Sequence, residues 1–121
     1  MAIAQEHHAH EQAQRLPISS VANHLQEILG QRLTAVIADV SDAKAIGKWA
    51  KGERTPHPDT ERRLRNAFQI TQLLVQTESS GTVRAWFTGM NPELGDRAPA
   101  LVIAEDPVQV LQAARAFLAN G

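Results

Sequence analysis

Four cations in the middle of the chain have the types and spacing that most clearly suggest a chemistry. They are Lys44, Lys48, Lys51 and Arg54. They include all three lysines of the 121-residue sequence, and the segment 31–70 carries eight basic against five acidic side chains. In a helix with Ile46 and Trp49 facing the core, these cations lie on the outer side, where they can contact phosphate groups. The middle of the chain is therefore a candidate DNA contact.

No set of residues indicates catalysis. The sequence offers no Ser-His-Asp set, no pair of carboxylates with a pocket and no glycine-rich phosphate loop, and its histidines are scattered apart from three near the start. Without cysteine there is neither a disulfide nor a thiolate metal site, which suits a reducing compartment. We expect a protein that is not an enzyme and that needs no cofactor or metal.

Composition narrows the class further. A formal net charge of −1 excludes a strongly basic nucleic-acid binder as an interpretation of the whole chain. No run of eighteen apolar residues predicts a membrane span, and the first ten residues lack the basic and apolar blocks of a signal peptide. We expect a cytoplasmic protein without a membrane partner.

The segment 82–99 contains several closely spaced residues that favour particular backbone conformations. Asn91-Pro92 predicts a turn, through a side-chain cap and the fixed φ of proline, and Gly95 predicts a positive φ. Trp86 and Phe87 are adjacent and cannot share a helical face, so we expect one to pack on the central helix. The other is expected to cover the turn or to lie at an interface.

The same segment resembles the toxin-binding domain of the Xre/MbcA/ParS antitoxin family, in which a tryptophan precedes an N-P-x-L-G-x-x-x-P stretch and a closing helix. The residues that carry the resemblance are Trp86, Asn91, Pro92, Leu94, Gly95 and Pro99. It covers about residues 83–117, and Asp96 replaces a second glycine that is common after Leu-Gly. The motif residues other than Asn91 are expected to be scaffold.

The resemblance implies a type II antitoxin that binds a RES-domain toxin, an enzyme that degrades NAD, in a hetero-oligomer. In the family the C-terminal helix and tail lie near the toxin's NAD-binding cleft. On that basis the toxin-binding candidates are Arg115, Leu118, Asn120 and Gly121, and Asn91 and Arg97 of the motif segment are candidates beside them. We expect the chain to inhibit by covering the cleft.

Residues 33–49 resemble an Xre-like helix-turn-helix, with the best match at Val40-Ser41, Ile46 and Trp49. The turn lacks the usual glycine, and Asp39 or Val40 stands there instead. The second helix has no Arg, Asn or Gln to read a base edge, so its lysines suit phosphate more than sequence. Operator binding and a merely solvated helix face both remain open.

Apolar periodicity predicts an all-α fold, a small bundle in which these segments are positioned. We expect a flexible segment over 1–17, a helix-turn-helix region over 18–78 and a toxin-binding domain over 79–121. Ser19 or Ser20 is expected to cap the first helix and Asp59 a long helix from about residue 60. That long helix has two apolar faces, which predicts packing on both sides or contact with a second copy in a homodimer. The alternative function is an Xre-type transcriptional regulator whose C-terminal half only dimerises.

Overall fold

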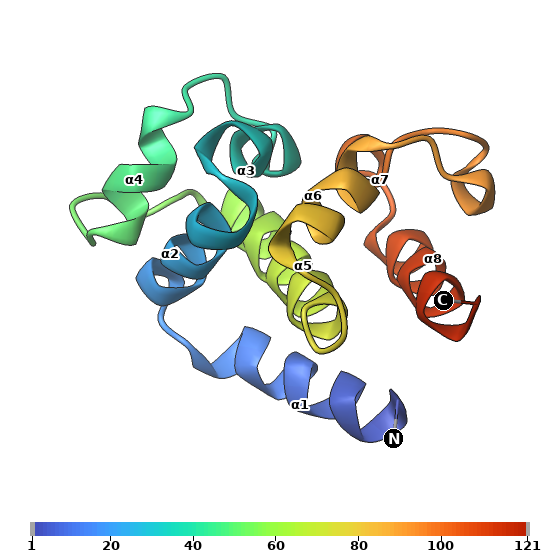
Figure 1. Ribbon diagram of the computed structural model, residues 1–121. Coiled ribbons are helices and arrows are strands. Elements are labelled where there is room, and N and C mark those ends of the chain that lie inside the picture. The colour runs from blue at the N-terminus through green and yellow to red at the C-terminus, as the bar shows by residue number, and fades with distance from the viewer. Residues whose placement is uncertain (1, 121) are drawn as a thin grey trace.

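The computed structural model describes residues 2–120, and the elements it forms there are helices joined by short turns, as the periodicity predicted (Figure 1). The elements are α1 (Ala2–Arg15), α2 (Ile18–Leu29), α3 (Gln31–Ala38), α4 (Lys44–Ala50), α5 (Pro58–Leu74), α6 (Ser80–Thr88), the 3-10 helix η1 (Pro92–Leu94), α7 (Pro99–Val102) and α8 (Pro107–Asn120). Among these residues no helix has the length and apolar character that crossing a bilayer requires.

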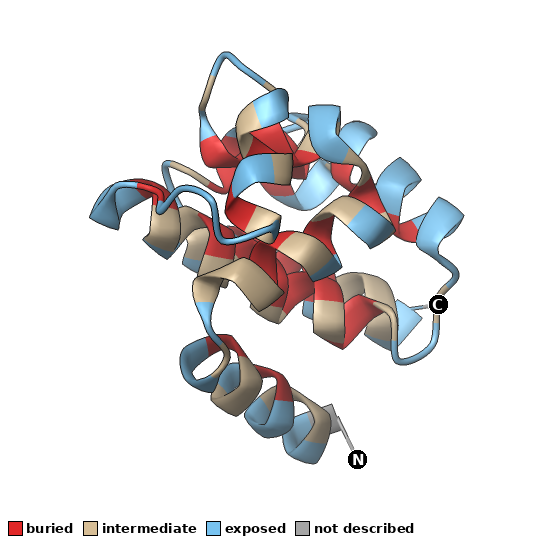
Figure 2. Ribbon diagram, turned by 90° about the vertical axis from the view of Figure 1, so that its left-hand side faces the viewer, coloured by how far each residue is buried: buried red, intermediate tan, exposed pale blue. Residues whose placement is uncertain are grey.

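Helix α5 is the centre of the molecule, and α1, α2, α3 and α8 all pack against it. Leu64 and Phe68 are buried on one face of α5, and Ile70 and Leu73 are buried on the other. Both apolar faces are therefore covered by the chain itself, so the intramolecular alternative is the correct one for this helix. Figure 2 shows the buried positions gathered on the inward sides of the helices.

The predicted boundary at residues 78 and 79 lies in the connection between α5 and α6, but the core does not stop there. One cluster of buried side chains joins Leu25 and Phe68 from the first part to Val83, Phe87 and Val110 from the second. Helix α6 packs on α2, and α7 packs on α3. The two predicted regions therefore share a single hydrophobic core.

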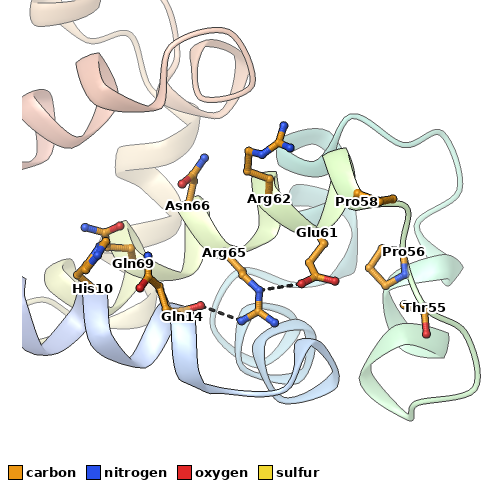
Figure 3. Close-up of a pocket in the computed structure, with 11 residues that line it drawn as sticks. His10, Gln14, Thr55, Pro56, Pro58, Glu61, Arg62, Arg65, Asn66 and Gln69 are labelled. Atoms are coloured by element: carbon orange, nitrogen blue, oxygen red, sulfur yellow. Dashed lines mark hydrogen bonds and ion pairs between the residues drawn. The ribbon is translucent and has the colours of Figure 1, made fainter.

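The first residues differ from the flexible segment that we expected. They form α1, in which Ala9 and Ala13, one helical turn apart, are buried at 1% and 3% exposure. Arg65 of α5 fastens the end of this helix: its Nη1 donates to the carbonyl oxygens of Ala13 and Leu16, each at 2.8 Å. Its Nε donates to Glu61 at 3.0 Å (Figure 3). Small side chains let α1 approach, and Arg65 satisfies carbonyls that a helix end leaves free.

Two predicted helix caps are wrong. Ser19 and Ser20 lie inside α2, which begins at Ile18 after Pro17. Asp59 lies inside the first turn of α5, because Pro58 already occupies the first helical position, where its missing N–H costs nothing. In both places a proline fixes the start of the helix one or two residues before the expected capping side chain.

The last helix begins with a side-chain cap followed by a proline. Oδ1 of Asp106 accepts the backbone N–H of Gln109 at 3.1 Å, and Pro107 follows as the first helical residue. This cap fixes the direction in which α8 leaves the core. Val110, Ala113 and Ala114 of α8 are buried.

Candidate interaction surfaces

The turn between α3 and α4 forms without the glycine that the pattern usually has. Asp39 takes its place in the left-handed region, with φ 59° and ψ 48°. Its N–H donates to the carbonyl of Val36 at 3.1 Å, and the next N–H, of Val40, donates to Ala35 at 3.0 Å. Aspartate is among the few residues other than glycine that adopt this conformation readily. The substitution therefore preserves the turn.

Helix α4 is oriented as its sequence predicted. Ile46 is fully buried and Trp49 is 7% exposed, while the four cations predicted to face outward are all exposed. We call Lys44, Lys48, Lys51 and Arg54 the basic face. Within residues 2–120 none of the four forms an ion pair with an acidic side chain, so their charges are available to an anionic partner.

The three lysines border a shallow hollow of about 320 Å³ that is not made by α4 alone. Gln26 of α2, Gln31 of α3 and the carboxylate Glu53 line it together with the lysines. Sequence reasoning missed both glutamines, because it considered only the side chains of the second helix. Their spacing from the lysines carries no signal, since the packing of α2 and α3 against α4 brings them there.

A second surface lies at the other end of the chain, between α6 and α8. A groove of about 450 Å³ runs there, which we call the Trp86 groove. Its lining is Ala85, Trp86, Gly89, Met90, Asn91, Pro92, Glu93, Ala113, Ala116, Phe117 and Asn120. The Trp86 ring meets Phe87 edge to face at 5.1 Å and lies 6.4 Å from Phe117 of α8. Phe87 is fully buried, so it is the core residue of the pair, and Trp86 forms the groove wall.

The Trp86 groove combines apolar surface with an unsatisfied donor. Met90, which lines it, is 82% exposed, a high value for a large apolar side chain. The indole Nε1 of Trp86 is shielded from solvent and has no hydrogen-bond partner among the described residues. A buried donor without an acceptor is costly, by about 1–3 kcal/mol. A partner that covers the groove would bury Met90 and the apolar lining around it.

The turn that forms one wall of the groove agrees with its prediction. Oδ1 of Asn91 accepts the N–H of Glu93 at 2.9 Å, and Gly95 has φ 63°. Asp96 also has a positive φ, 65°, at the position where the family has its second glycine. Leu94, at 4% exposure, anchors the turn in the core. Pro99 is buried at the first position of α7.

The structure brings together only some of the predicted toxin-binding residues. Asn91 and Asn120 line the Trp86 groove, in company with Trp86 and Pro92, which were predicted to be scaffold. The motif and the end of α8 therefore meet at one surface. Leu118 is half-buried and packs against the core.

The two predicted cations lie elsewhere. Arg115 points to α1, where its Nε donates to the carboxylate of Glu6. Arg97 pairs with Glu105 at 3.0 Å. The hydrogen bond and the charge of Glu105 raise the pKa of Arg97 above its ordinary value, and the same contacts lower the pKa of Glu105. Gly121 lies outside the described residues.

A third hollow, of about 600 Å³, separates α1 from the start of α5 (Figure 3). Its charged side chains from α5 are already engaged, since Arg65 pairs with Glu61 and Arg62 pairs with Asp59. It is a seam between helices, which Arg65 bridges through its hydrogen bonds to the carbonyl oxygens of Ala13 and Leu16. Within residues 2–120 no group of three or more acidic or histidine side chains is arranged to hold a metal ion.

The basic face and the Trp86 groove lie far apart. In Figure 1, α4 stands at the left-hand edge of the molecule, and α8 stands at the right-hand edge. The first surface is cationic and shallow, and the second is largely apolar. Two such different surfaces fit two different classes of partner.

Comparisons of the chain with protein-family models, with curated proteins and with solved structures found no match.

Proposed function

We propose that the chain is a type II antitoxin that binds a RES-domain, NAD-degrading toxin through the Trp86 groove. The observation that carries the proposal is the groove itself. Trp86, Asn91 and Pro92 of the antitoxin-like motif and Asn120 at the end of α8 line one largely apolar surface. Binding another protein would cover Met90, which is 82% exposed, and the apolar lining around it. Inhibition of this kind needs a stable contact surface and no catalytic residue.

In this proposal, α8 acts through its end. Asn120 is exposed and lies at the edge of the groove, so a toxin segment seated on Trp86 would have the last turn of α8 beside it. The helix end would then cover the NAD-binding cleft. Arg115 is a weaker candidate for that role, because its guanidinium is already held by Glu6 on the side facing α1.

The test is a pair of matched variants. Met90→Glu places a charge on the groove, and Leu101→Glu places the same charge on α7 at an apolar residue that is 57% exposed and does not line the groove. The chain and each variant are co-expressed with the RES-domain toxin, and growth and cellular NAD are followed. We expect Met90→Glu to weaken toxin binding about tenfold or more, because an unpaired charge is costly in an apolar interface. We expect Leu101→Glu to protect as the parent chain does.

Two results would overturn the proposal. NAD loss that continues in the presence of the parent chain would remove the antitoxin function. Full protection by Met90→Glu would leave that function standing but would exclude the groove as the contact. Circular dichroism of both variants checks that the fold is retained.

A second function rests on the basic face: contact with operator DNA, through which the antitoxin would regulate its own operon. The left-handed Asp39, the buried Ile46 and Trp49 and the outward cations are what a helix-turn-helix needs to present its second helix to the major groove. A homodimer would place two such helices on one operator, and it stays a prediction. A transcriptional regulator without a toxin partner would bind DNA and would give no protection in the co-expression assay.

A further inference from the structure

A chain of side-chain hydrogen bonds connects α2 and α3 to the basic face. Nδ2 of Asn23 donates to the carboxylate of Glu27 at 3.1 Å. Nε2 of Gln26 donates to Oδ1 of Asn23 at 3.0 Å, and Nε2 of Gln31 donates to Oε1 of Gln26 at 3.0 Å. We call these four residues the amide relay. It ends at Gln31, which lines the hollow bordered by the three lysines.

The relay has a direction that its first member imposes. A carboxylate only accepts hydrogen bonds, so Asn23 must turn its NH₂ group toward Glu27. The carbonyl of Asn23 then accepts from the NH₂ group of Gln26, and the carbonyl of Gln26 accepts from the NH₂ group of Gln31. Gln31 is therefore left with its carbonyl Oε1 and one N–H, and the relay fixes which of its atoms is which.

The absence of a side chain at Gly47 of α4 leaves room for the amide of Gln31. A Cβ atom at position 47 would lie 2.8 Å from Nε2 of Gln31, closer than side-chain contacts allow. Gly47 also lies on the stripe of α4 that carries Lys44, Lys48 and Lys51. The amide of Gln31 thus rests on the recognition side of α4, among the cations, although it belongs to another helix.

We propose that Gln31 is the base-reading residue that α4 lacks, and that it selects an A·T base pair. This inference rests on the proposed contact with DNA. One carbonyl acceptor and one N–H donor on a planar amide match the N6 amino group and N7 of adenine in the major groove. A phosphate oxygen, which only accepts, could use the N–H but not Oε1. The lysines contact phosphate, and Gln31 supplies the sequence preference.

The test is selection from a pool of duplexes with a random central segment, carried out with the full chain, Gln31→Ala and Lys48→Ala. We expect the parent chain to enrich adenine at one fixed position. Gln31→Ala should lose that preference, a change of about tenfold in discrimination, and should keep its affinity for random duplexes. Lys48→Ala should weaken binding to all sequences and lower the salt slope by about 1, while adenine remains enriched.

A fourth variant tests the direction of the relay. Lysine only donates, so Glu27→Lys should reverse the amides and leave Gln31 with two outward N–H donors, which match O6 and N7 of guanine. We expect the preference at that position to move from adenine to guanine. An unchanged adenine preference in Glu27→Lys would show that the relay does not orient Gln31.

The outcomes separate the inference from the function on which it rests. If the parent chain retards no duplex at low salt, the DNA contact fails and the inference fails with it, while the toxin assay is unaffected. If the parent chain binds DNA but enriches no adenine, or if Gln31→Ala selects the same sequences as the parent, only the role of Gln31 is overturned. Alanine is a good helix former at this exposed position of α3, so the fold of that variant is kept.

Discussion

Two aspartates adopt a backbone conformation that most residues avoid. Asp39 and Asp96 have φ of 59° and 65°, and they stand at the two positions where the resembled patterns have glycine. In the sequence, both aspartates depart from the pattern. In the structure, both adopt the positive φ for which glycine is usually needed, because aspartate tolerates the left-handed region better than branched or bulky residues do.

This conformation predicts opposite effects of two small substitutions at one site. Asp96→Gly should leave the free energy of unfolding unchanged or raise it by up to about 1 kcal/mol, because glycine enters this region without strain. Asp96→Ala should lower it by about 1 kcal/mol, since alanine keeps a Cβ and enters the left-handed region less readily than aspartate does. Urea denaturation followed by circular dichroism measures both. A glycine variant less stable than the alanine variant would contradict the account.

Single side chains also show where sequence reasoning stops. The motif residues Trp86, Asn91 and Pro92 could be found in the sequence, and so could the turn that Asn91 caps. That Trp86 and Asn120 line one groove could not, because the two residues belong to helices that only the fold brings together. Gln31 was missed for the same reason.

At the scale of elements, apolar periodicity predicted an all-helical fold, and it failed at α1, where we expected a flexible segment. The buried positions of α1 are alanines, which give little apolar signal among glutamines and histidines. Much of what holds α1 comes from Arg65, far along the chain, whose guanidinium reaches the carbonyls of Ala13 and Leu16. A contact of that kind has no local pattern.

The fastening of α1 can be tested without unfolding the rest. Arg65→Ala removes the donors for those two carbonyls, so we expect local opening of α1 to become easier by about 1–3 kcal/mol. Hydrogen exchange of the peptides that cover residues 2–15 should accelerate, and exchange in α5 and α8 should stay slow. Mass spectrometry of digested samples reads each segment separately.

Arg62→Ala is the matched control. Arg62 lies on the same helix and also forms an ion pair, but its side chain is 70% exposed and its pair with Asp59 is within one turn. Exposed pairs of this kind contribute about 0–1 kcal/mol. If hydrogen exchange in α1 accelerates equally in both variants, the hydrogen bonds of Arg65 do not hold α1 in place.

At the scale of the molecule, the shared core predicts a single cooperative unfolding transition, even though the chain carries two motif regions. Each region has one tryptophan, Trp49 in α4 and Trp86 in α6, so each can be followed alone. In Trp86→Phe the remaining fluorescence reports on α4, and in Trp49→Phe it reports on α6. Within each variant, we expect fluorescence and circular dichroism to give the same urea midpoint.

A difference between the two probes would show that one region unfolds before the other. The division at residue 78 would then be a true domain boundary, and the buried contacts of α6 with α2 would contribute little to cooperativity. The comparison is made inside each variant, so a loss of stability from the tryptophan replacement itself does not affect it.

The wide separation of α4 and α8 also bears on how the two proposed activities would combine. A chain that binds an operator through α4 would keep α8 exposed to solvent, and a toxin that binds at α8 would not cover the basic face. Occupancy of one surface would not sterically block the other, so a ternary assembly is open to this molecule. Any influence of toxin on repression would then act through the shared core or through the number of copies gathered on the operator.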